Sequence, residues 1–383
     1  MSAAEAVAAI ALAIWLYLLL ARGGFWRERP APPPAPLDAW PEIVAIVPAR
    51  NEAETIGAAI GSLLRQRYAG AFSIVLVDDH SSDGTAAAAR RAAAEAGAAH
   101  RLAIIAARPL PEGWSGKLWA VSEGIRHVAE RGSEASYLLL TDADIAHDPD
   151  NAAELVARVE RQHLDLASLM VKLRCASFAE RWLVPAFVFF FQMLYPFAWV
   201  NDRHHRIAGA AGGCMVVRRA ALDRAGGIAS IRGALIDDCA LAQRLKQAGG
   251  AIWLGLTERT RSLRPYPRLG DIWRMIARTA YTQLHYSPLL LGATVLGMTV
   301  TYLAPPALTP LGGIAGLLAA LAWFAMMVAF VPTLRLYRQP LAMAPFLPLI
   351  AFFYLAATID SARRHWQGRG GEWKGRVQQR GAA

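Results

Sequence analysis

The sequence predicts an α/β domain with a doubly wound sheet, joined to membrane helices in its N- and C-terminal parts. Three observations support this prediction. Short apolar runs alternate with Ala-rich helical stretches between residues 43 and 172. Apolar runs that suit membrane helices stand near both ends of the sequence, although the first, residues 6–21, is short for a span unless Phe25 and Trp26 extend it to the interface. The composition is 55% hydrophobic and only 18% charged, which is too apolar for an ordinary soluble enzyme.

The first apolar run, residues 6–21, predicts a membrane anchor over residues 1–29. No positive charge precedes the run and no small-residue cleavage site follows it, so we expect an uncleaved anchor rather than a signal peptide. Arginines follow the run, which favours an external N-terminus and a cytoplasmic flank. Residues 30–41 are Pro-rich and predict a stiff linker.

The region 42–260 is expected to form the α/β domain. Buried parallel strands are typically continuous apolar runs, and the sequence offers five of them at 43–47, 73–77, 102–105, 137–140 and 166–171. The Ala-rich stretches that lie between these runs predict helices at 53–66, 84–97, 117–130 and 150–161. Strands that alternate with helices in this way indicate a doubly wound α/β domain.

A further apolar segment, 182–200, interrupts this domain and is expected to be interfacial or re-entrant. It is long enough to span a bilayer, but it contains Pro185 and Pro196. If it spanned, Asp144 and Asp238 would lie on opposite sides of the membrane.

The C-terminal part predicts an amphipathic interface helix, membrane helices and a basic tail. Apolar residues at helical spacing, interspersed with arginines, predict the interface helix within 261–286. Membrane helices are expected within 287–360, the first two forming a hairpin that turns at Pro305-Pro306, and a basic tail at 361–383. An anchor followed by three full spans would place this tail outside, against the positive-inside tendency. Either the last run is therefore re-entrant, or another run is not a full span.

The net charge of +10 has two possible explanations, nucleic acid or membrane flanks. Many basic residues stand beside apolar runs, and no helix-turn-helix or RNA-binding pattern occurs, so we expect a bilayer and no nucleic acid. The three cysteines, Cys175, Cys214 and Cys239, lack metal-type spacing. We expect reduced thiols and a cytoplasmic domain.

Three acidic clusters stand at the ends of apolar runs: Asp78-Asp79, Asp142-Ala143-Asp144 and Asp237-Asp238. Crowded carboxylates require a cation, a proton or a ligand to neutralise them. The first two clusters follow predicted strands, where open α/β sheets place their ligands. Asp142 and Asp144 alternate along an extended strand end, so both point the same way. This arrangement suits a hard divalent cation that also binds a substrate diphosphate.

Polar residues after the first two strands are candidates for nucleotide binding, each with an alternative explanation. Pro48, Ala49, Arg50, Asn51 and Glu52 follow the first strand and either face a nucleotide or form a helix-capping turn. Asp78 and Asp79 can accept hydrogen bonds from a base or ribose, while Asp83 is better explained as a helix cap.

Two further candidates lie on helices. Lys117 contacts a phosphate or belongs to a solvated helix face. Asp237 and Asp238 open a predicted helix. They either complement the helix dipole or supply a general base from a desolvated pocket.

The motifs, taken in order, resemble those of family-2-type inverting glycosyltransferases. The strings VPARNE, VDDHSSDGT, GWSGKLWA, TDADI and IDDCALAQRL carry this resemblance over residues 43–250. The strings FVFFFQMLYPFAWVND, AGGCMVVRRAAL, RMIARTAYTQLHYSPLLL and GEWKGR are more similar still to the membrane-bound, hopene-associated glycosyltransferases of bacteria.

The resemblance implies a GT-A-like fold, a nucleotide-sugar donor that is usually UDP-linked, and Mg²⁺ or Mn²⁺. It also assigns roles by position: Asp78 and Asp79 hold the nucleoside, Asp142 and Asp144 hold the metal and the diphosphate, and Asp238 is the base. Gly212-Gly213-Cys214 lines the acceptor side.

The sequence departs from the family pattern in one place. Processive and ceramide-type relatives carry a Gln/Arg-x-x-Arg-Trp motif before their C-terminal spans, whereas this sequence reads Met275-Ile276-Ala277-Arg278-Thr279. Arg278 is expected to keep a diphosphate contact. The missing Trp disfavours polymerisation and favours the transfer of a single sugar.

The predicted function is therefore metal-dependent transfer of one sugar to a membrane lipid hydroxyl, with a hopanoid as the expected acceptor. The expected location is the inner (plasma) membrane, with several spans and a cytoplasmic catalytic domain. Two alternatives stay open: transfer to a polyprenyl phosphate, which needs no strong base, and a non-catalytic membrane scaffold of lipid biosynthesis.

Overall fold

The computed structural model describes residues 1–369, 372–373 and 376–377, so residues 370–371, 374–375 and 378–383 of the predicted basic tail lie outside the described residues. The chain forms two compact units. One contains Met1–Glu28, Arg174–Trp199 and most of the chain after Pro265, and is called the helical unit here. The other contains Arg29–Leu173 and Val200–Arg264, and is called the α/β unit.

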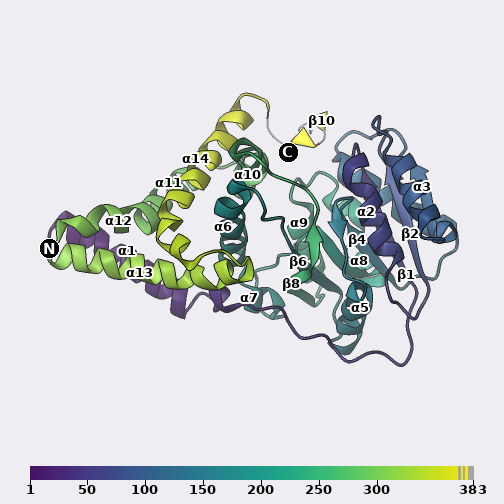
Figure 1. Cartoon of the computed structure of the whole chain (residues 1–383), viewed down its shortest axis with the longest axis horizontal. Helices are drawn as coiled ribbons and strands as arrows, with labels where there is room; N and C mark the ends of the chain where they lie inside the picture. Colours follow the sequence, from purple (N-terminus) through teal and green to yellow (C-terminus); the bar gives the residue numbers. More distant parts are fainter. Residues whose placement is uncertain (370–371, 374–375, 378–383) are drawn as a thin grey trace. The chain divides into compact units, whose positions relative to one another are not determined.

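The α/β unit contains a sheet of eight strands within the described residues, in the order β3-β2-β1-β4-β7-β6-β8-β5. Strands β1, β2, β4, β6 and β8 are labelled in Figure 1. Four neighbouring strands are parallel, as predicted: β1 (Ile43–Ala49), β2 (Phe72–Asp78), β3 (Leu102–Ala106) and β4 (Tyr137–Thr141). Each of these strands contains its predicted apolar run and extends it by one or two residues.

The other half of the sheet is mixed, which corrects the expectation of parallel strands throughout. The run 166–171 forms β6 (Leu166–Lys172), but β7 (Cys214–Arg218) lies between it and β4 and is antiparallel to both. A parallel connection needs a crossover helix packed on the sheet. Between β6 and β7 the chain instead enters the helical unit and returns in the opposite direction. β8 (Ile252–Ser262) is parallel to β6, and β5 (Ile145–Ala146) is antiparallel to the end of β8.

Helices cover both faces of the sheet, which confirms the doubly wound prediction. On one face, α2 (Ala53–Leu64), α3 (Thr85–Glu95) and α5 (Asn151–Arg161) bury their apolar sides against alternate residues of the strands. On the other face α4 (Gly116–Glu130) approaches the sheet closely, because a Cβ atom on Gly124 would lie 2.6 Å from Ile46 Cγ2. Position 124 therefore requires glycine.

The α/β unit also contains three short elements, η2 (Ala99–Arg101), α8 (Arg219–Arg224) and η3 (Ile228–Ile231), and one longer helix, α9 (Asp237–Gln247). The Pro-rich linker is held to α5, because Arg158 Nη2 donates to the Pro32 carbonyl at 2.7 Å and Arg161 Nε donates to the Ala35 carbonyl at 2.7 Å.

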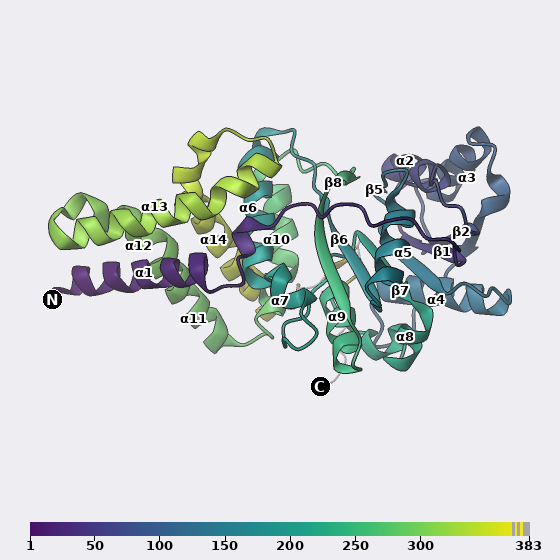
Figure 2. The same ribbon diagram turned by 90° about the horizontal axis from the view of Figure 1, so that it is seen from below.

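In the helical unit, α1 (Ala3–Leu20) packs along α13 (Gly313–Leu336), as Figure 2 shows. The predicted interface helix is α10 (Leu269–Gln283), which packs against α14 (Leu347–Trp366). Trp273 Nε1 of α10 donates to Asp360 Oδ2 of α14 at 2.8 Å. η1 (Phe25–Arg27) follows α1, and η6 (Leu341–Phe346) precedes α14.

Four helices among the described residues are long and apolar enough to cross a membrane. They are Ala3–Leu20, Pro288–Leu311, Gly313–Leu336 and Leu341–Trp366. The segment 182–200 is not among them: it divides into α6 (Phe178–Leu194), which contains Pro185, and α7 (Phe197–Asn201). Its interfacial or re-entrant placement stays a prediction.

The predicted hairpin turn at Pro305-Pro306 is wrong. The helical path runs on through α11 (Pro288–Met298), a π-helical turn at Thr299–Leu303, α12 (Ala304–Leu308) and η5 (Thr309–Leu311). The two prolines stand in the first turn of α12, where their missing N–H groups disrupt little. The chain reverses instead at Gly312 and Gly313, whose φ values of 66° and 57° favour glycine.

Candidate active site

The loops after β1 and β2 interlock at the carboxyl end of the sheet. Asn51 has a φ of 52°, and its side-chain oxygen accepts from the Ser82 amide at 2.9 Å. Arg50 Nη1 lies 2.5 Å from the Asp79 carbonyl and 3.7 Å from its carboxylate, and Asp79 is only 1% exposed. A non-glycine residue in left-handed conformation is uncommon and often marks a functional loop. The predicted nucleoside residue Asp79 thus stands beside a guanidinium.

The other residues predicted in these loops have mainly structural contacts. Ala49 is buried in the core, and its carbonyl accepts from the Asp79 amide at 2.8 Å. Asp78 accepts from the Ser81 amide at 3.0 Å. Asp83 accepts from the Ala53 and Thr85 amides, so it holds the first turns of two helices.

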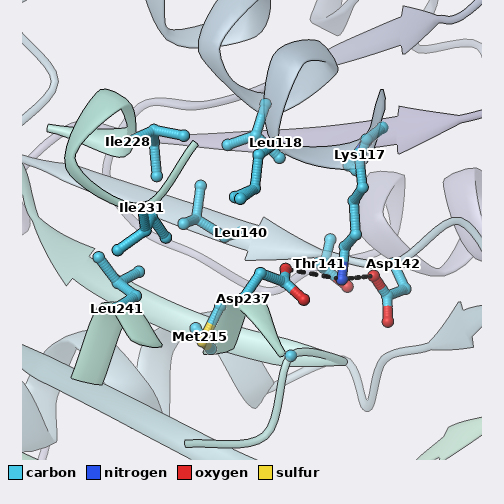
Figure 3. A pocket seen from close by; sticks show the side chains of 13 residues that line it. Lys117, Leu118, Leu140, Thr141, Asp142, Met215, Ile228, Ile231, Asp237 and Leu241 are labelled. Atoms are coloured by element: carbon cyan, nitrogen blue, oxygen red, sulfur yellow. Dashed lines mark ion pairs between the residues drawn. The ribbon is translucent and has the colours of Figure 1, made fainter. Parts of the chain in front are cut away.

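Lys117 joins the second and third acidic clusters (Figure 3). Its ammonium nitrogen lies 2.8 Å from Asp142 Oδ1 and 3.0 Å from Asp237 Oδ2. Burial alone would lower the pKa of Lys117, but the neighbouring carboxylates outweigh it and raise this pKa. Burial also raises the pKa of Asp142, and Lys117 offsets only part of that effect. Lys117 is therefore a fixed positive charge inside the site and not part of a solvated helix face.

Asp144 is neutralised by a residue that the sequence motifs did not indicate. Arg264, just beyond β8, places Nε 2.5 Å from Asp144 Oδ2 and Nη2 2.6 Å from Glu52 Oε1. The Leu263 amide also donates to the Asp144 carbonyl at 2.7 Å. This guanidinium links the end of β4 to the loop after β1. The sequence patterns gave no signal for Arg264, because residues 252–262 were not among the predicted strands.

Asp238 lies at the N-terminus of α9 and accepts two backbone hydrogen bonds. The Gly212 amide donates to Oδ2 at 2.8 Å, and the Cys239 amide donates to Oδ1 at 2.7 Å. Burial and the charge of Asp237 raise the pKa of Asp238 to about 6. A carboxyl group with this pKa is suited to accept a proton near neutral pH.

A cavity opens beside these charges. It is lined by apolar side chains from α4, β4, β7, η3 and α9, including Leu118, Leu140, Met215, Ile231 and Leu241. Lys117, Asp142 and Asp237 stand at its polar end, and Pro48 of β1 contributes to its wall (Figure 3). Apolar walls exclude water and so strengthen the electrostatic interactions of the charged end.

The sequence predicted a metal at Asp142 and Asp144, and the described residues contain no group of three His, Cys, Asp or Glu side chains placed to hold one. Two aspartates at one strand end still fit a magnesium-type ion, which typically takes one or two carboxylates and completes its shell with substrate phosphates and water. Arg264 and Lys117 hold these carboxylates in the present structure.

Arg278 is exposed on α10 in the helical unit. The other predicted site residues all lie in the α/β unit. The diphosphate contact expected of Arg278 therefore stays a prediction.

Two family profiles match this chain. The family profile described as "Glycosyl transferase family group 2" matches residues 137–357, and "Glycosyl transferase family 2" matches residues 44–226. Comparison with curated protein sequences finds no match.

Among solved structures, a mannosyltransferase from Pyrobaculum calidifontis, in complex with GDP-Man and Mn²⁺, is similar with a TM-score of 0.56. It is 20% identical, over 95% of this chain and 99% of that one. This similarity shows a GT-A-like fold. Glucosyl-3-phosphoglycerate synthase from Mycobacterium tuberculosis, in complex with Mg²⁺ and uridine diphosphate, is less similar. Its TM-score is 0.41 and its identity 16%, over 64% of this chain and 79% of that one.

Proposed function

Because the chain belongs to glycosyl transferase family group 2, we propose that it transfers one sugar, with inversion, from a nucleotide-sugar to a membrane lipid hydroxyl. The observation that carries this proposal is the convergence of Asp142, Asp237 and Lys117 at one end of an apolar cavity, with Asp238 beside them. This arrangement offers a diphosphate site and a base in one place.

The donor lies across the carboxyl ends of β1, β2 and β4. Asp78 and Asp79 hold the nucleoside, and Arg50 keeps the Asp79 carboxylate in place. Asn51 and Glu52 shape the neighbouring loop. Lys117 contacts the diphosphate, and the contact expected of Arg278 rests on the family resemblance alone. The donor is UDP-linked, as the family resemblance implies; the similar mannosyltransferase was solved with GDP-Man.

Asp142 and Asp144 would hold Mg²⁺ or Mn²⁺. A divalent cation at this position would act as a Lewis acid that stabilises the negative charge of the departing nucleoside diphosphate. The contribution of the chain is to supply two hard oxygen ligands from one strand end. Arg264 contacts Asp144 and Lys117 contacts Asp142, so a bound cation would compete with these two side chains for the carboxylates.

Asp238 is the general base. It takes the proton of the acceptor hydroxyl as that oxygen attacks the anomeric carbon of the donor from the side opposite the diphosphate. The bond between the anomeric carbon and the diphosphate oxygen breaks, so the configuration inverts and the nucleoside diphosphate leaves with the bonding electron pair. The Gly212 and Cys239 amides orient the carboxylate, and its raised pKa suits proton transfer.

The acceptor is a membrane lipid, a hopanoid or a similar polycyclic lipid. Four helices with the length and composition of membrane spans support a bilayer location, and the apolar walls of the cavity suit an apolar acceptor. The transferase domain comprises 42–260 and the end of β8. It lies on the cytoplasmic side of the plasma membrane, between an anchor within 1–29 and the helices of 287–360. The hopanoid assignment rests on the similarity of the sequence strings to hopene-associated transferases.

The decisive experiment is donor turnover by the full-length protein in detergent. Common nucleotide-sugars are supplied with Mn²⁺ or Mg²⁺, with hopanoid, with polyprenyl phosphate or without lipid, and nucleoside diphosphate release is recorded. We expect release that depends on hopanoid and is abolished in both Asp144→Ala and Asp238→Asn, while Asp238→Asn still binds the donor. Release of nucleoside diphosphate only with polyprenyl phosphate would show that the acceptor is a polyprenyl phosphate and not a lipid hydroxyl. Folded protein that binds no donor in the presence of metal would support a scaffold instead.

A further inference from the structure

A line of buried polar side chains runs beneath the candidate site and is not used by the mechanism above. It consists of Thr260, Asn151, His147 and Thr141, each at most 6% exposed. Thr260 Oγ1 lies 3.0 Å from Asn151 Oδ1, and Asn151 Nδ2 lies 3.1 Å from His147 Nδ1. His147 Nε2 lies 2.9 Å from Thr141 Oγ1. The line therefore connects β8, α5 and β4.

The direction of each hydrogen bond follows from the end of the line. The Gly213 carbonyl can only accept, so the Thr141 hydroxyl, 2.7 Å away, donates its proton to it. The Thr141 oxygen must then accept from His147, which places the imidazole proton on Nε2. His147 Nδ1 accepts from the Asn151 amide, and the Asn151 carbonyl accepts from Thr260. Burial lowers the pKa of His147 to about 3, so the imidazole has one donor and one acceptor, as this line requires.

The line ends at the turn that contacts the candidate base. β7 begins at Cys214, so Gly212 and Gly213 lie outside the sheet ladder. They carry no side chains that could fix them. Ser168 holds the turn on one side through the amide and carbonyl of Ala211. Thr141 holds the other side through the Gly213 carbonyl. Between these two tethers the Gly212 amide donates to Asp238 Oδ2.

We propose that His147 is a positioning residue, which through Thr141 holds the Gly212-Gly213 turn so that the Gly212 amide meets the Asp238 carboxylate. The imidazole is not among the groups that line the cavity. Its role is to leave the Thr141 hydroxyl only one orientation, toward Gly213. The consequence for turnover rests on the proposed function, whereas the consequence for the turn itself does not.

Two substitutions of His147 test the roles of the two imidazole nitrogens separately. In His147→Gln the side-chain amide can reach the position of Nε2 and donate to Thr141. In His147→Asn the shorter amide reaches only the position of Nδ1 and contacts Asn151. Both variants are of similar polarity, and the exposed His100→Asn is the matched surface control. Thermal unfolding checks that all three are folded.

The first readout is amide hydrogen exchange of residues 208–213 in the full-length protein. It requires no donor or acceptor, so it tests the positioning role even if the proposed function fails. We expect faster exchange of this segment in His147→Asn and near wild-type exchange in His147→Gln and His100→Asn. Equal exchange in the Asn and Gln variants would overturn the proposal.

The second readout is steady-state kinetics with the donor identified for the wild type. Loss of a residue that orients a functional group typically lowers activity about 10- to 100-fold. We expect His147→Asn to lose kcat in this range with donor KM changed less than about twofold, and His147→Gln to recover most of kcat. A loss confined to donor KM, or a Gln variant as impaired as the Asn variant, would contradict the role. Absence of turnover in the wild type would reject the proposed function and leave the exchange result to decide the role of His147.

Discussion

The ammonium group of Lys117 lies 2.8 Å from the carboxylate of Asp142, so a cation of the chain itself occupies the strand end where the sequence predicts a divalent metal. The same ammonium reaches Asp237 at 3.0 Å. Lys117 therefore neutralises carboxylates of two clusters that are far apart in the sequence.

Removal of Lys117 should destabilise the protein and make it more responsive to metal. We expect Lys117→Ala to lower the free energy of unfolding by about 1–2 kcal/mol, because two partly buried carboxylates lose their counter-charge. Mn²⁺ should restore more stability to this variant than to the wild type, because the ion supplies the missing charge. Thermal unfolding with and without Mn²⁺ measures this, with the exposed Arg90→Ala as control. An identical Mn²⁺ effect in all three proteins would argue against a metal at this strand end.

The pH dependence of turnover should reflect Asp238. Its pKa is raised to about 6 by burial and by Asp237, so kcat should fall as pH drops through about 6 and the base becomes protonated. The check is kcat measured across this range. An acid limb well below pH 5 would point to a different group.

The same raised pKa gives a prediction for stability with the opposite sign. The folded state binds this proton more tightly than the unfolded state does. The contribution of Asp238 to the free energy of unfolding is therefore greatest below about pH 4 and decreases as pH rises to about 6. Asp238→Asn should remove this decrease. Chemical unfolding of both proteins at several pH values tests it, and an unchanged pH dependence in the variant would be the contrary result.

Arg264 should compete with a metal for Asp144. Because its guanidinium binds both Asp144 and Glu52, Arg264→Ala should bind Mn²⁺ several-fold more tightly than the wild type when no nucleotide is present. Arg264→Lys should fall between the two, since an ammonium cannot bridge two carboxylates as a planar guanidinium does. Titration calorimetry with Mn²⁺ measures the affinities. Weaker Mn²⁺ binding in Arg264→Ala would show that Arg264 supports the metal ligands instead.

The contact between α10 and α14 should depend on Trp273. Its indole donates to the Asp360 carboxylate, which Arg364 also contacts at 2.7 Å. Trp273→Phe should lower the free energy of unfolding by about 1.5–3 kcal/mol, the usual contribution of a hydrogen bond to a charged group. Unfolding in detergent is the measurement, with the exposed Trp366→Phe as control. If Trp273→Phe lowered the free energy of unfolding as much in an Asp360→Asn background as in the wild type, loss of this hydrogen bond would not explain the destabilisation.

The Pro-rich linker should be held less tightly when one of its two arginines is removed. Arg158→Ala removes the bond to the Pro32 carbonyl and the stacking of this guanidinium on Trp253, whose ring centre is 4.2 Å away. We expect faster proteolytic cleavage within 30–41, while exposed Arg91→Ala behaves as wild type. Cleavage rates followed by gel electrophoresis decide this.

Much of the α/β unit was predictable because local patterns determine it. The strands β1, β2, β3, β4 and β6 were evident from their apolar runs, and four helices from the stretches between them. β5, β7 and β8 were missed as strands. The antiparallel direction of β7 was not foreseen, because direction depends on the path of the chain through the helical unit. The prediction of a turn at Pro305-Pro306 was wrong for a local reason, because prolines in a first helical turn are compatible with a helix that continues.

The sequence by itself determined where the carboxylates of the candidate site stand, since each cluster follows or opens a regular element. Only the tertiary structure decided which cation each carboxylate meets. Arg264 reaches Asp144 across 120 residues of sequence, and Lys117 reaches Asp142 and Asp237 from a separate helix. The line of hydrogen-bonded side chains through His147 could likewise not be predicted from the sequence. Hydrogen bonds and ion pairs of this kind require loops from distant strands to approach within about 3 Å, and that approach is set by the packing of the whole sheet rather than by any local pattern.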